Sequence, residues 1–167
     1  DTKKIVELPA LEESDLPDSR EEGRHRTRWV RDFSPGERYA RFLDAAPESF
    51  EDPGVGRVLD SAGTIFVNAV MGFTPHFTAG TERLNREIAR NRDALKLFGG
   101  GDTLQELKNL NPGFYMSALD DPSCYFFTGG GTVLKAIEQG SPYGLETVRA
   151  LLENGGRAPG NTPSGTP

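Results

Sequence analysis

One thiol and one imidazole are the side chains of this sequence best suited to covalent chemistry. Cys124 is the only cysteine, and His76 lies between two phenylalanines in FTPHFTAG. An imidazole that deprotonates a thiol creates a nucleophile, so a small helical enzyme that uses Cys124 and His76 is one alternative. Nothing in the spacing brings the two together, and a cysteine before Tyr-Phe-Phe is more often a buried apolar residue. We therefore assign no catalytic residue.

Metal and cofactor chemistry has little support in the sequence. The second histidine, His25, lies in a basic segment, and no further His, Cys or carboxylate stands at ligand spacing near His76. The run Asp120-Asp121-Pro122-Ser123 is typical of a turn and not of a catalytic pair of carboxylates. We predict no bound metal and no cofactor.

A dense group of arginines occupies GRHRTRWVRDF. Arginines interleaved with aromatic side chains suit contact with phosphates and stacking on bases, so a nucleic-acid-binding protein is a second alternative. The chain carries a net charge of −6, which opposes it. We expect these arginines to pair with acidic residues of the flanking segments instead. The residues of this alternative are Arg24, Arg26, Arg28 and Trp29, with Arg31 and Phe33 nearby.

Two glycine triplets are the most regular motif. LFGGGDTLQEL at 97–107 and FTGGGTVLKAI at 127–137 resemble each other at an offset of 30 residues. A glycine loop before a helix can present backbone amides to an anion. Neither triplet continues into the Lys and hydroxyl of a nucleotide loop, and we expect no strand before Gly99 and only a doubtful one at CYFF. We therefore favour glycines that reverse the chain between helices.

Hydrophobic periodicity favours an all-α fold. Ser34-Pro35-Gly36-Glu37 has the residues of a helix start. Apolar residues across 55–73 follow the helical i, i+3, i+4 spacing, and a charged helix is expected from Thr81 to about Phe98. The sequence therefore predicts a helical core that extends to residue 98.

Residues 130–159, GGTVLKAIEQGSPYGLETVRALLENGGRAP, resemble an ankyrin repeat. The first helix matches the family at Thr132, Leu134 and Ala136, although Val133 and Lys135 replace its usual Pro and His. SPY is an insertion between the helices, and one residue is missing before Gly140. The second helix matches the family at Leu145, Glu146, Val148, Leu151, Leu152 and Gly155.

This resemblance implies a division of the chain into segments. Residues 94–102 look like a degenerate upstream copy, and 161–167 look like the start of a further repeat. Because a lone unit cannot cover both of its faces, the chain is expected to be a fragment of a longer protein. The expected parts are a flexible acidic arm at 1–22, a helical capping region at 23–98, a repeat region at 99–159 and a tail at 160–167.

The function implied by the resemblance is a non-catalytic protein–protein interaction scaffold. Its partner is another protein; we expect no small-molecule ligand, no nucleic acid and no membrane, since no apolar run reaches roughly 20 residues. The single cysteine fits an intracellular, cytoplasmic location. The residues expected to contact the partner are Lys135, Glu138, Tyr143 and Arg149.

Overall fold

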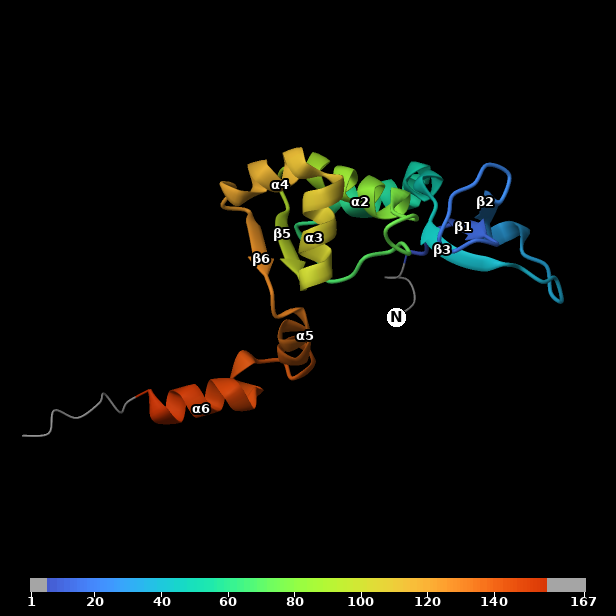
Figure 1. The fold of residues 1–167 in the computed structure, drawn as a ribbon. Coiled ribbons are helices and arrows are strands. Elements are labelled where there is room, and N and C mark those ends of the chain that lie inside the picture. The colour runs from blue at the N-terminus through green and yellow to red at the C-terminus, as the bar shows by residue number, and fades with distance from the viewer. Residues whose placement is uncertain (1–5, 156–167) are drawn as a thin grey trace, which may run out of the picture. The chain divides into compact units, whose positions relative to one another are not determined.

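The computed structural model describes residues 6–155 of a chain that divides into two units (Figure 1). Unit 1 ends at Thr128 and unit 2 begins at Gly129. The boundary expected at residues 98 and 99 lies inside strand β5 (Leu95–Gly99) of unit 1. Each unit is described by itself.

The first sheet of unit 1 is antiparallel, with the strand order β2-β1-β3. Its strands are β1 (Ala10–Ser14), β2 (His25–Trp29) and β3 (Arg41–Ala45). Two 3-10 turns accompany it, η2 (Val30–Asp32) and η3 (Pro47–Glu51). Strand β1 is largely buried and lies within the segment 1–22, which was expected to be a flexible arm.

Ion pairs explain how a strand as acidic as ALEES is buried. Glu13 is 1% exposed, and its Oε2 accepts hydrogen bonds from Arg26 Nε at 2.9 Å and Arg28 Nε at 2.6 Å. Its Oε1 accepts another from the Ala40 amide at 2.6 Å. These hydrogen bonds lower the pKa of Glu13 to about 2, and the bond from Arg26 has the largest effect. The expected pairing of the arginines with neighbouring acidic residues is thus confirmed at Arg26 and Arg28.

The second sheet of unit 1 is parallel, with the strand order β4-β5-β6. Its strands are β4 (Thr64–Val67), β5 (Leu95–Gly99) and β6 (Cys124–Phe127). The helices of the unit are α1 (Pro53–Ser61), α2 (Ala79–Arg90), α3 (Gly101–Leu110) and α4 (Pro112–Leu119). Helix α2 connects β4 to β5, and α3 and α4 connect β5 to β6, as parallel strands require.

The core of the parallel layer forms where these helices pack on the sheet (Figure 1). Ile88 of α2, Phe98 of β5 and Leu107 of α3 are buried together. The Phe98 ring stacks on Phe126 of β6 at 5.7 Å and meets Phe114 of α4 edge-on at 6.0 Å. Aromatic contacts of this kind add to the free energy of apolar burial.

The prediction of an all-α fold is wrong. No helix begins at Ser34: Gly36 has a φ of +84°, and β3 follows at Arg41–Ala45. The expected helix over 55–73 ends at Ser61 and gives way to β4. These apolar runs are short, and four or five residues fit the helical and the strand periods equally well.

Asn91 separates helix from strand where one helix to Phe98 was expected. Its side-chain oxygen accepts bonds from the Asp93 and Ala94 amides, at 3.1 Å and 3.0 Å. Its amide nitrogen donates to Leu59 O at 2.7 Å and Ala62 O at 2.9 Å. This side chain therefore turns the chain after α2 and directs it into β5.

Unit 2 contains two short helices, α5 (Gly130–Glu138) and α6 (Glu146–Asn154), with the 3-10 turn η4 (Pro142–Gly144) between them. Their positions agree with the two helices expected from the sequence. Leu145 is 7% exposed, whereas Leu151 is 72% and Leu152 is 62% exposed. The expected start of a further repeat at 161–167 and the tail at 160–167 lie outside the described residues.

Among the helices of residues 6–155, none combines the length and the apolar composition needed to cross a bilayer.

Replacement of Glu13 by Gln tests the ion pairs of the antiparallel sheet. Because the pKa of Glu13 is lower in the folded chain than its ordinary 4.5, the ionised group stabilises the fold above pH 4.5. This contribution disappears as the pH falls from 4.5 to about 2. Glu13→Gln should lower the free energy of unfolding by about 2 kcal/mol at pH 7, as measured by urea denaturation. The exposed Glu22→Gln is the control, and a difference from wild type that persists at pH 2 would contradict this account.

Candidate functional site at the carboxyl edge of the parallel sheet

Three chain segments leave the parallel sheet at the same edge. Asn68 follows β4, Gly100 follows β5, and Thr128 follows β6. The carboxyl ends of parallel strands are where α/β proteins bind ligands, because the loops there converge while the strands hold them in place. This edge is the candidate site of unit 1.

The glycine turn after β5 lies close against the side chain of Asn68. Gly100 has φ +93° and ψ +142°, a backbone conformation that L-residues rarely adopt. A Cβ at Gly99 would lie 2.9 Å from Asn68 Oδ1, and one at Gly100 would lie 3.2 Å from it. The Gly100 amide donates to Phe127 O at 2.9 Å, which ties the turn to the end of β6. The backbone conformation therefore requires glycine at position 100, whereas a side chain at position 99 would displace the Asn68 amide.

The glycine turn opens directly into helix α3. Gly100 stands at the helix cap and no side chain caps its amides. The first amides of a helix lack carbonyl partners within it and carry partial positive charge, so they attract anions. The expectation that no strand precedes Gly99 is wrong, since β5 ends at this glycine. A strand, a glycine turn and an uncapped helix form the arrangement that binds phosphate groups in many α/β proteins.

The second triplet shares the same local sequence of elements. Strand β6 ends at Phe127, so the strand that seemed doubtful at CYFF is present. In unit 2, helix α5 begins at Gly130, and the cap residue Gly129 likewise makes no side-chain hydrogen bond.

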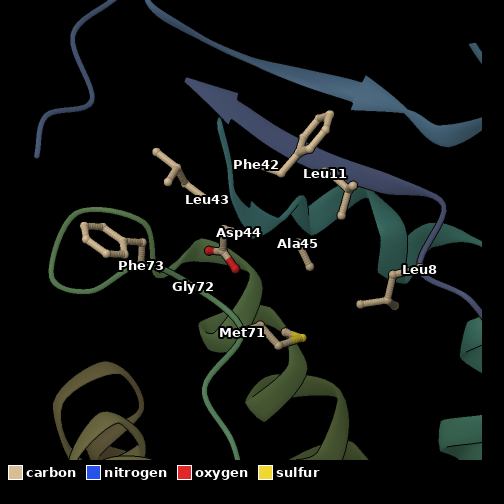
Figure 2. Close-up of a pocket in the computed structure, with 9 residues that line it drawn as sticks. All are labelled: Leu8, Leu11, Phe42, Leu43, Asp44, Ala45, Met71, Gly72 and Phe73. Carbon is tan, nitrogen blue, oxygen red and sulfur yellow. The ribbon is translucent and has the colours of Figure 1, made fainter. Parts of the chain in front are cut away.

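The loop after β4 leads from Asn68 to an apolar pocket of about 460 Å³ (Figure 2). Its walls come from the segment before β1, from β1 and β3, and from the loop itself. The lining residues are Leu8, Leu11, Phe42, Leu43, Asp44, Ala45, Met71, Gly72 and Phe73. Asp44 is the only ionisable residue among them.

Asp44 is a buried acid that connects the two layers of unit 1. It is 4% exposed, and its Oδ2 accepts a hydrogen bond from the Gly80 amide in α2 at 2.9 Å. Its Oδ1 is buried without a partner among the described residues. Burial, together with the negative charge of Glu12, its neighbour across β1 and β3, raises the pKa of Asp44 to about 6.

The structure does not bring the Cys124 thiol and the His76 imidazole together. Cys124 is buried in β6, where burial raises the pKa of its thiol. His76, in contrast, is exposed in the loop before α2. A thiol with a raised pKa is a poor nucleophile at neutral pH, so this pair offers no catalytic chemistry. In the described part of the chain, no group of three or more His, Cys, Asp or Glu side chains is placed to hold a metal ion.

The other predicted site residues lie away from the glycine turn or in unit 2. Arg24, Arg26, Arg28 and Trp29 belong to β2 or directly precede it, and the Arg31 guanidinium lies over the Trp29 ring at 4.7 Å. In unit 2, four exposed side chains are those proposed to contact a partner: Lys135, Glu138, Tyr143 and Arg149. Their role in binding stays a prediction.

The sequence analysis did not single out three residues of this site. They are Asn68, Asp44 and Gly100, whose backbone conformation requires glycine. The available signal was the apolar run LKLF directly before GGGD, which is long enough for a strand. Nothing in the sequence indicated that Asn68 and Asp44 approach residues more than 30 positions away.

Asp44→Asn tests the buried acid. Because the pKa of Asp44 in the folded chain, about 6, exceeds its ordinary 3.8, the fold favours the neutral acid, and stability falls as the pH rises from 3.8 to 6. The variant should lose this pH dependence and be more stable than wild type by about 2 kcal/mol above pH 6. Thermal unfolding between pH 4 and pH 7.5 measures it, with the exposed Asp18→Asn as control. Equal slopes for wild type and Asp44→Asn would refute the assignment.

Comparison with known proteins identifies one family. A profile of the phosphoglycerate kinase family matches residues 14–140. A phosphoglycerate kinase of Thermus thermophilus is 34% identical over 108 residues, which are 64% of this chain and 25% of the relative. The enzyme of Haemophilus influenzae is 34% identical over 86 residues, 50% of this chain and 20% of the relative. The chain thus spans about a quarter of the length of these curated relatives.

A solved structure agrees at the level of the fold. The structure of phosphoglycerate kinase from Coxiella burnetii aligns with 81% of this chain and 32% of its own, with a TM-score of 0.55 and 19% identity. That likeness supports the α/β architecture and contradicts the expected helical solenoid.

These findings correct the interpretation drawn from the sequence. The ankyrin resemblance is wrong, and with it the non-catalytic scaffold and the expectation of no small-molecule ligand, because the matched family consists of kinases named for a small-molecule substrate. Two short helices after a glycine-rich turn are present in this α/β chain as well, so the C-terminal pattern did not distinguish the two families. The profile match extends over most of the chain, from the antiparallel sheet to the end of α5. This chain belongs to the phosphoglycerate kinase family.

Proposed function

We propose that this chain supplies a nucleotide-binding edge of a phosphoglycerate kinase and takes part in phosphoryl transfer between a nucleotide and a phosphoglycerate. The observation that carries the proposal is the uncapped first turn of α3, which the Gly99–Gly101 turn presents at the carboxyl edge of the parallel sheet. The family name states the substrate class for the relatives. That this chain acts on the same substrate class is part of the proposal.

The phosphate groups of the nucleotide would lie against the first turn of α3. Its amides carry partial positive charge and need no rearrangement to receive an anion. Without Cβ atoms, the turn lets a phosphate approach the backbone closely. Asn68 stands beside the turn and carries a side-chain amide that can donate to a phosphate oxygen.

The base of the nucleotide would occupy the pocket of about 460 Å³ shown in Figure 2. Residues 68–73 run from the glycine turn to this pocket, so one extended ligand could follow the loop. The pocket walls are mostly apolar, and Leu43 and Phe73 contribute to them. Apolar and aromatic walls are what a flat heteroaromatic ring requires.

No side chain is assigned as a general base. Phosphoryl transfer depends mainly on the positioning of the two substrates and on electrostatic stabilisation of the transferred group, and backbone amides can supply part of both. Unit 2 offers a second uncapped helix after a glycine triplet, which supports a similar role for Gly129–Gly131. Family membership and the single, buried cysteine support a cytoplasmic location.

Titration calorimetry of the 167-residue protein with Mg²⁺-ADP tests the proposal. Wild type should bind the nucleotide saturably. Gly100→Ala should bind at least about tenfold more weakly, because a side chain at φ +93° costs about 1–3 kcal/mol and displaces the turn.

Gly63→Ala is the matched control. A methyl group at Gly63 would meet open space, and the backbone there has no positive φ, so this variant should bind as wild type does. A folded wild type that shows no saturable binding, or equal affinities for the two variants, would overturn the proposal.

A further inference from the structure

The amino end of the parallel sheet carries a separate polar pocket of about 430 Å³. Its lining residues come from α2, β5 and α4 and from the segments that follow α2 and α4. Lys96 is the second residue of β5 and Gly99 is the last, so at about 3.3 Å per residue the two ends are roughly 10 Å apart along the strand. The pocket is therefore distinct from the glycine turn.

Lys96 is a buried cation that faces this pocket. It is 3% exposed, and the acceptor found for its Nζ is Ala94 O, at 3.2 Å. An ammonium group has three donors, and a buried charge is costly unless it is paired. Among the described residues, no carboxylate lies within ion-pair distance of Lys96. Asp121 lies near enough for the Lys96 charge to help lower the pKa of its carboxyl group, but no direct ion pair forms among the described residues, so two donors of Lys96 face the pocket without an acceptor among those residues.

Two further features make the pocket attractive to an anion. Arg92 lines it with an exposed guanidinium that forms no ion pair within residues 6–155. Gly113 and Phe114 line it from the first turn of α4, whose cap residue Asn111 makes no side-chain bond to the helix. Open space surrounds Gly113, so an anion can approach the backbone there.

Asp121 is the acidic member of the lining. Its Oδ1 accepts bonds from the Ser123 amide at 2.8 Å and the Ser123 hydroxyl at 2.7 Å, and these bonds lower its pKa. The carboxylate is therefore ionised and held toward Ser123. Lys96 and Arg92 together outweigh this single negative charge.

We propose that this pocket binds a small oxyanion of the phosphate class, either free phosphate or the phosphate group of a monoester. Lys96 provides the buried charge, Arg92 a guanidinium at the entrance, and the first turn of α4 backbone amides. A compact tetrahedral anion with several acceptor oxygens can satisfy all three, whereas a halide has no such set of directed acceptors. The site lies at the opposite end of β5 from the nucleotide edge and does not depend on the function proposed for it.

Amide NMR titration of the full chain with inorganic phosphate, at constant ionic strength, tests the proposal. The amides of Lys96 and Gly113 should shift saturably, and they should still do so in Gly100→Ala. Arg92→Gln removes an exposed charge and should raise the apparent Kd for phosphate about tenfold. The exposed Lys108→Gln of α3 should leave the Kd unchanged.

Three outcomes would overturn the proposal. The first is the absence of saturable shifts at Lys96 and Gly113, and the second is an unchanged Kd in Arg92→Gln. The third is equal affinity for acetate and phosphate, which would show that the pocket does not select the phosphate class. Lys96→Met should abolish the shifts at Gly113; if that variant does not fold, Arg92→Gln decides.

Discussion

The close approach of three backbone segments at the carboxyl edge of the parallel sheet is the constraint on which the candidate site depends. The Gly100 amide is bonded to Phe127 O, and the side chain of Asn68 occupies the space that a Cβ at Gly99 would need. The end of β5 is thereby held to β6 by a backbone hydrogen bond and packs against β4 through the Asn68 side chain. Because the glycine turn leaves β5 at this point, the first turn of α3 faces outward with uncapped amides. In the proposed function, phosphate recognition therefore rests on backbone geometry more than on side-chain chemistry.

Buried charges organise the rest of unit 1 in two contrasting ways. Glu13 is fully matched by Arg26, Arg28 and a backbone amide, so its negative charge stabilises the antiparallel sheet. Asp44 has one amide partner and one oxygen without a partner among the described residues, so burial opposes its charge. It nevertheless connects β3 to the start of α2, and α2 also packs on the parallel sheet through Ile88. The apolar pocket beside Asp44 therefore lies at the junction of the two layers.

The two anion sites proposed here lie at opposite ends of β5 and use different chemical groups. At Gly99 and Gly100 the absence of side chains exposes the backbone, whereas at Lys96 a long side chain places a cation in the interior. Residues between these positions, above all Phe98, build the aromatic core that keeps both ends in place. The role proposed for the first end draws on the family that the chain matches. The second end follows only from the residues of this chain.

The sequence by itself determined the local features that depend on neighbours along the chain. These include the helices of unit 2, the pairing of β2 arginines with acidic residues, and the repeated glycine triplets. Short runs such as TIFV, LKLF and CYFF were ambiguous, because four or five apolar residues satisfy both helical and strand periods. Only the tertiary structure decided that they pair as a parallel sheet, since that pairing joins residues about 30 positions apart. The same holds for the contact of Asn68 with the glycine turn and for the hydrogen bond of Asp44 with Gly80. The distance between such side chains depends on the topology of the fold, and the local spacing of residues does not determine it.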